Sequence, residues 1–118
     1  MNITAWILQG LLAFVFLMAG FMKAFSPKEK LAAQMGWVND YSSGTVKFIG
    51  LSEILGSIGL ILPYALGIVP VLTVIAALAL ALVMVLAIPV HIKRKEANMV
   101  ATNTVLLILL IVVVVLRF

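Results

Sequence analysis

The feature that most constrains this chain is a stretch from Ile54 to Val90 in which no residue carries a charge. Its 37 residues are nearly twice the roughly 20 that one helix needs to cross the hydrocarbon core of a bilayer. Three turn-forming residues interrupt its first half, namely Pro63, Gly67 and Pro70. We therefore expect two transmembrane helices joined by a tight turn, over about residues 46–62 and 68–90, with Pro70 in the first turn of the second.

Apolar stretches on either side of this segment predict two more spans, over about residues 3–25 and 99–116. The valine and isoleucine run in the last stretch would suit a buried strand in a soluble protein, but an open strand edge is not viable in lipid. Of the 118 residues, 65% are hydrophobic and 10% are charged, against about 45–50% and 25% in soluble domains. The sequence predicts an all-α protein with a single transmembrane domain, an integral membrane four-helix bundle.

The first loop contains a signal for a short interfacial helix over about residues 27–35. Ser26 suits its N-cap and Glu29 suits the matching position of a capping box. Trp37 and Tyr41 follow, and amphipathic aromatic side chains of this kind are favoured at the level of the lipid headgroups. We expect the helix to lie along the membrane surface.

The charges of the loops predict how the bundle is oriented. With four spans, one side of the membrane receives Lys28, Lys30, Lys47, Lys93, Arg94 and Lys95, and the other receives only Arg117. Basic loops stay in the cytoplasm, so both termini should face away from it, and we expect the plasma (inner) membrane. The net charge of +4 is explained by this orientation rather than by a nucleic-acid partner, because the basic residues flank apolar segments and form no stripe on a polar face.

Several classes of chemistry have no support in this sequence. There is no cysteine, which excludes disulfides, thiol redox chemistry and thiolate metal sites. One histidine and one glutamate within the spans do not make a catalytic zinc site or a bis-histidine haem site. We also find no nucleophile with a base, no phosphate loop and no dinucleotide fingerprint, so we predict no catalytic residues, no metal site and no cofactor other than a bound quinone or lipid.

Polar residues near the cytoplasmic ends of the four predicted spans form the candidate binding site, namely Glu53, Lys23, His91 and Asn103. An ionisable group within a span is costly and suggests a function. Glu53 should find a cation or keep its proton, and Lys23 is its natural partner, although that lysine could instead extend to the headgroups. His91 could be an exposed boundary residue, and Asn103 could hydrogen-bond a neighbouring helix.

Small residues form one face of the second span beside Glu53. Ser52, Gly56 and Gly59 fall within about 60° of one another at 100° per residue. Close packing of helices is the expected use of such a face. The alternative is that the missing side chains leave room beside Glu53 for a flat or chain-like ligand.

These residues resemble the DoxX-like family of small four-helix membrane proteins. The likeness rests on Gly20-x-x-Lys23, Gly36-Trp37, Gly50-x-x-Glu53-x-x-Gly56-x-x-Gly59-Leu60-x-Leu62-Pro63 and Ala87-x-x-x-His91. The resemblance implies the four-helix fold and, for some relatives, an association with quinone-linked oxidoreductases or with resistance to quinones and oxidative stress. It implies no reaction, because the family is functionally mixed.

The first functional hypothesis is a binding protein for a quinone-like or lipid ligand, or the membrane subunit of a redox system with an oxidoreductase partner. A homo-oligomer is a further possible assembly. The second hypothesis is a structural or chaperone-like membrane protein whose polar residues only fix helix packing. The third is a small proton-coupled transporter, which the position of Glu53 in the second span and the strong charge bias of the loops disfavour. Proton-dependent efflux of a compound from vesicles that contain the protein would favour this transporter hypothesis.

The predicted orientation can be tested with single cysteines, since the chain has none of its own. We expect a cysteine at Asn2 to react with a membrane-impermeant thiol reagent in intact cells and a cysteine at Lys95 to be protected. Labelling of position 95 with protection of position 2 would show that the bundle is inserted the other way round.

Overall fold

The computed structural model describes residues 3–69 and 71–118 of the chain, so the expected position of Pro70 lies outside the described residues. The elements in chain order are α1 (Ile3–Phe25), α2 (Lys28–Gln34), the 3₁₀ helix η1 (Gly36–Asp40), α3 (Ser43–Leu66), α4 (Val71–Lys93) and α5 (Ala97–Arg117). Four of these helices are long and apolar enough to cross a membrane, and the described segments contain no strand. The prediction of an all-α membrane bundle of four helices is confirmed.

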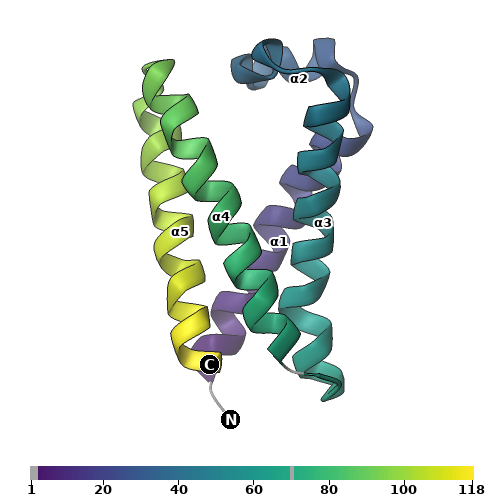
Figure 1. Ribbon diagram of the computed structural model, residues 1–118, viewed down its shortest axis with the longest axis vertical. Coiled ribbons are helices and arrows are strands. Elements are labelled where there is room, and N and C mark those ends of the chain that lie inside the picture. Colours follow the sequence, from purple (N-terminus) through teal and green to yellow (C-terminus); the bar gives the residue numbers. More distant parts are fainter. Residues whose placement is uncertain (1–2, 70) are drawn as a thin grey trace.

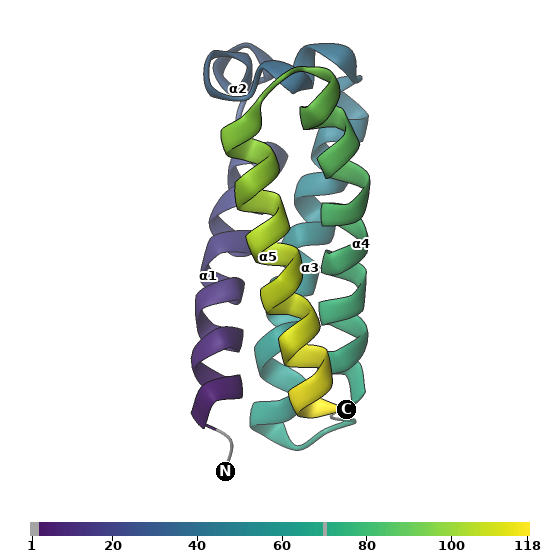
Figure 2. The same cartoon turned by 90° about the vertical axis from the view of Figure 1, so that its left-hand side faces the viewer.

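The four long helices run antiparallel, and they form two pairs. α1 packs mainly on α3, and α4 packs mainly on α5 (Figures 1 and 2). α1 begins and α5 ends at one end of the bundle, which we call the terminal end; α2 and η1 lie across the other, which we call the α2 end. Figure 1 shows the two pairs crossing near the terminal end and separating toward the α2 end.

The apolar core lies where the pairs meet. Its buried members come from all four long helices, and they include Leu12, Phe16, Leu60, Leu80, Leu110 and Val113. Large apolar side chains on the outer faces remain exposed, such as Phe14, Leu55 and Val115. Lipid is as apolar as these side chains, so exposure of this kind is expected for a bundle that is solvated by acyl chains.

Two glycines allow α1 and α3 to cross in close contact. A Cβ atom added to Gly50 would lie 2.6 Å from the Gly20 carbonyl oxygen and 2.6 Å from the Ala24 nitrogen. A Cβ atom added to Gly20 would lie 2.6 Å from the Gly50 carbonyl oxygen. Both contacts are with backbone atoms, which cannot move aside as a flexible side chain would, so the crossing requires glycine on both helices.

Two glycines of the small-residue face of α3 contact α4 closely. A Cβ atom at Gly56 would meet the Leu80 side chain at 2.6 Å, and one at Gly59 would meet the Ala76 Cβ at 2.8 Å. The hydroxyl of Ser52, the third member of this face, donates to the Phe48 carbonyl of its own helix at 2.8 Å.

α3 continues past Pro63 to Leu66, whereas the sequence places the end of this span at about residue 62. Proline has no N–H group, so a proline inside a helix leaves the carbonyl four residues earlier without its usual partner. Here the Thr73 hydroxyl of α4 donates to that carbonyl, on Gly59, at 3.0 Å. The helix ends at Gly67, which adopts the left-handed conformation with φ 66°.

The first turn of α2 differs from the sequence prediction. Its N-cap is Pro27, which makes no side-chain capping hydrogen bond, so the expected cap by Ser26 is wrong. Packing holds the segment instead: Leu31, Trp37 and Val38 form a buried apolar cluster with Val46 of α3. Burial of these side chains therefore stabilises the segment in place of a capping box.

Gly50→Ala tests the close crossing of α1 and α3. We expect the added methyl group to force the two backbones apart and to destabilise the bundle by about 1–3 kcal/mol. The measurement is the free energy of unfolding in mixed detergent micelles. Gly10→Ala on α1 is the matched control, because a Cβ atom there meets nothing within 4 Å. Equal stability of the two variants would contradict the crossing.

Candidate functional site

The crossing of α1 and α3 places Lys23 beside Glu53. Each of the two residues lies three positions after a crossing glycine, Gly20 on α1 and Gly50 on α3. The Lys23 Nζ lies 2.7 Å from the Glu53 Oε1, and the glutamate is only 1% exposed. Two buried opposite charges at this distance compensate each other. Lys23 therefore pairs with Glu53, as the sequence predicts, and does not extend to the headgroups.

His91 and Asn103 face the same region from the other helix pair. The His91 ring is 4% exposed, and its Nδ1 lies 2.9 Å from the Glu96 Oε1. Asn103 is 6% exposed, and no hydrogen bond joins its side-chain amide to another residue within 3–69 and 71–118. Its amide atoms are not among the fully enclosed polar atoms of the described residues, so the amide remains accessible to a partner.

All four predicted binding residues line one cavity of about 570 Å³ between the helix pairs. Its remaining walls are mainly apolar, with Phe16 and Val15 from α1, Phe48 and Ile49 from α3, and Met84 and Leu106 from α4 and α5. Ser52, the third small residue of α3, also lines this cavity. The cavity occupies the half of the bundle in which the two pairs separate.

The segment after α2 covers the cavity, which the sequence analysis did not anticipate. Met35, Trp37 and Tyr41 line it, and the Lys23 Nζ lies 5.6 Å from the centroid of the Trp37 ring. Trp37 is 9% exposed and Tyr41 is 36% exposed, and nothing in their spacing in the sequence indicates that both side chains reach the cavity. Their placement depends on the contact of η1 with the helices below it.

An ion-pair network links the two helix pairs at the α2 end. Arg94 of the α4–α5 loop lies 2.9 Å from the Asp40 Oδ2 and 3.5 Å from the Glu96 Oε1. Gly36 leaves room for this side chain, since a Cβ atom there would lie 2.5 Å from the guanidinium. The same Glu96 contacts His91. The network therefore connects α4, which forms one wall of the cavity, to η1, which covers it.

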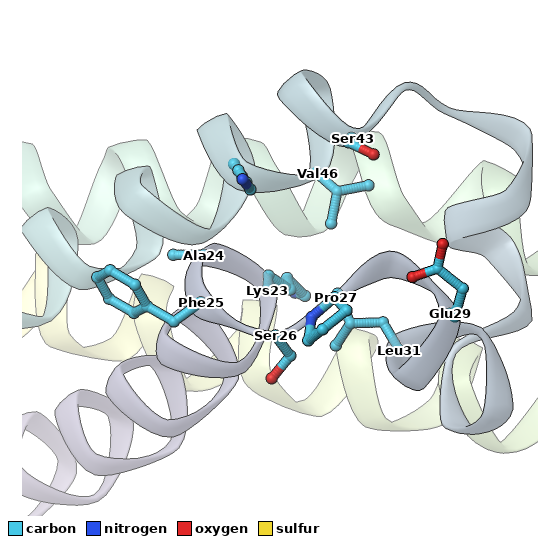
Figure 3. A pocket seen from close by; sticks show the side chains of 10 residues that line it. Lys23, Ala24, Phe25, Ser26, Pro27, Glu29, Leu31, Ser43 and Val46 are labelled. Carbon is cyan, nitrogen blue, oxygen red and sulfur yellow. The ribbon is translucent and has the colours of Figure 1, made fainter.

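A second hollow of about 400 Å³ lies beside the first, between the end of α1, α2 and the start of α3 (Figure 3). Its lining includes Ser26, Glu29, Ser43 and Lys47, all near the surface of the bundle. Lys23 lines both this hollow and the larger cavity. The lysine therefore stands between the two spaces.

At the terminal end, Arg117 holds α1, α3 and α5 together. Its Nε donates to the Gln9 Oε1 at 2.7 Å, and its guanidinium lies 3.9 Å from the centroid of the Tyr64 ring and 5.1 Å from that of Trp6. Gln9 in turn donates to the Leu60 carbonyl at 2.6 Å. By its position in the sequence Arg117 is only a loop charge, although an uncharged polar residue such as Gln9 within a span is a signal for such a partner.

The polar groups of the cavity differ in chemical type. In the part of the chain that the structure describes, no three His, Cys, Asp or Glu side chains are placed to hold a metal ion. What the cavity offers is a neutralised ammonium group, an amide and an imidazole above apolar walls. Such a set can orient a neutral ligand by hydrogen bonds.

A family model described as the DoxX-like family matches residues 7–113. The chain belongs to the DoxX-like family. The match includes all four predicted binding residues, and with four candidate spans it describes a multi-pass membrane protein whose surroundings are a lipid bilayer. Neither a curated protein nor a solved structure matches this DoxX-like chain.

The pairing of Lys23 with Glu53 can be measured with a double-mutant cycle. Glu53→Gln and Lys23→Met should each cost about 3–5 kcal/mol of unfolding free energy, because each leaves one buried charge without its partner. The double variant should lose less than the sum of the two. Lys47→Met serves as the control for removing an exposed lysine and should change little. Simple additivity of the two losses would show that the charges are independent.

Proposed function

We propose that this DoxX-like protein binds an amphipathic ligand from the membrane in the cavity between its helix pairs, and that the ligand is a quinone. The observation that carries the proposal is the convergence of one polar side chain from each transmembrane helix on a single apolar cavity, with Asn103 unpaired there. Helix packing alone would favour polar groups that satisfy one another. A ligand with its own polar atoms supplies what Asn103 lacks.

The size and lining of the cavity support a small ring compound. Ligand sites commonly span about 300–1,000 Å³ and are mostly apolar with a few convergent polar groups. A volume of about 570 Å³ lies within this range, and Phe16, Trp37 and Phe48 offer aromatic surfaces. The Lys23 ammonium and the Asn103 amide can donate hydrogen bonds to carbonyl oxygens.

The balance of charge favours a quinone over a phospholipid headgroup. Both ligands present oxygen acceptors on an apolar body, so the same donors could serve either one. Burial of the anionic phosphate of a lipid is favoured by a free cation, however, and Glu53 already neutralises Lys23 at 2.7 Å. A neutral carbonyl needs only the remaining N–H donors of the lysine.

The wider role that we propose is that of a membrane component of a redox system. In such a system an oxidoreductase partner would carry the electron transfer, and this chain would hold the quinone. We further propose that the protein resides in the plasma (inner) membrane with both termini outside the cytoplasm, on the strength of the basic residues in its α2-end loops.

Thermal unfolding of the purified protein in detergent tests the proposal. We expect 2,3-dimethyl-1,4-naphthoquinone to raise the melting temperature by several degrees, because a ligand that binds only the folded state stabilises it. Ala87→Phe should remove this shift, since residue 87 lines the cavity and a benzyl group there occupies the space for the ring. Ala79→Phe is the matched control on α4, because Ala79 is exposed on the outer face, and it should keep the shift.

A short-chain phospholipid is the second arm of the same experiment. A shift with the phospholipid alone, removed by Ala87→Phe, would assign the cavity to lipid and reject the quinone. If neither compound shifts the melting temperature, or if the two alanine variants respond alike, the cavity is not a ligand site and the structural hypothesis is preferred.

A further inference from the structure

The polar groups of the cavity belong to two sets that do not bond to each other. α1 and α3 supply Lys23 and Glu53, which are bonded to one another. α4 and α5 supply His91, whose Nδ1 is occupied by Glu96, and Asn103. Over residues 3–69 and 71–118, no hydrogen bond or ion pair joins the first set to the second.

Polar contacts that join the helix pairs lie at both ends of the bundle. They include Arg94 with Asp40 at the α2 end and, at the terminal end, Arg117 with Gln9 and Thr73 with the Gly59 carbonyl. Between these ends, the two sets of cavity residues defined above face each other with no bond between them in the described part of the chain. Figure 1 shows the pairs separating toward the α2 end.

Each set retains unused hydrogen-bonding capacity. An ammonium group has three N–H donors, and the contact with the Glu53 Oε1 uses one donor of Lys23. The Asn103 amide offers both a donor and an acceptor, and neither is paired among the described residues, although the residue as a whole is only 6% exposed. Each of the two helix pairs therefore presents unused hydrogen-bonding groups to the cavity.

We infer that the occupant of the cavity is two-ended, a flat ring that carries a hydrogen-bond acceptor on each of two opposite edges. One acceptor bonds to the Lys23 ammonium and the other to the Asn103 amide. The inference rests on the proposed function and narrows its ligand class. A 1,4-quinone meets the requirement, whereas a cyclic ketone with one carbonyl meets only half of it.

The bound ring then joins the two helix pairs at the level where protein contacts do not. The ring lies between apolar walls, and its two carbonyl oxygens replace the missing polar contact across the cavity. Recognition thus depends on the spacing of two acceptors rather than on apolar surface alone, so removal of either donor should weaken a two-ended ligand selectively.

The test compares two rings of similar size on two variants. The rings are 2,3-dimethyl-1,4-naphthoquinone, whose substituents block addition of lysine amines, and 1-tetralone, which lacks the second carbonyl. Asn103→Leu removes the amide at nearly constant volume, and Asn98→Leu makes the same change at an exposed position of α5. Dissociation constants are obtained from the dependence of melting temperature on ligand concentration.

We expect Asn103→Leu to raise the dissociation constant of the quinone by about threefold to tenfold, which corresponds to the usual contribution of one hydrogen bond. Binding of 1-tetralone should be unchanged by it, and Asn98→Leu should alter neither ligand. If the quinone binds the parent protein but Asn103→Leu has no effect, the two-ended ligand is wrong while the proposed function stands. If Asn103→Leu does not fold, the affinities of the parent protein for the two rings decide the question. Equal affinity for both would overturn the two-ended ligand. Failure of both rings to bind the parent rejects the proposed function itself.

Discussion

The contact of Gly20 with Gly50 sets the geometry on which the polar half of the bundle depends. Both helices approach until backbone faces backbone, at a distance that any side chain would prevent. One turn further along, the same approach brings an ammonium group and a carboxylate to 2.7 Å in a buried position. Neither charge could be held alone at that depth at acceptable cost. The glycines and the ion pair therefore depend on the same short separation of α1 and α3. The glycines permit this separation, and the ion pair needs it.

The sequence was sufficient for features that depend on local physics. Charge-free stretches of the right length mark the four spans, and the cost of a lone buried charge predicts that Glu53 pairs with Lys23. It was also sufficient to group His91 and Asn103 at a similar depth, and the structure places both on one cavity with that pair. Their role in binding stays a prediction.

Other features depend on partners that are distant in the sequence. Pro63 stays inside α3 because Thr73, beyond the next turn, bonds the carbonyl that the proline releases. Gln9 and Arg117 meet although they lie at opposite ends of the chain. The inward position of Trp37 follows from tertiary packing with Val46, since no local periodicity specifies it. In each case a local rule was overridden by a contact that exists only in the assembled bundle.

Lys23 lies between two hollows of different character. On one side lies a surface hollow with serine and charged residues in its lining, and on the other lies the larger, mainly apolar cavity. The side chain of this one lysine is part of the wall of both spaces, and on the cavity side it is bonded to Glu53. The partition between the two hollows is therefore also a bond between α1 and α3, so any change that moves this side chain alters both spaces at once.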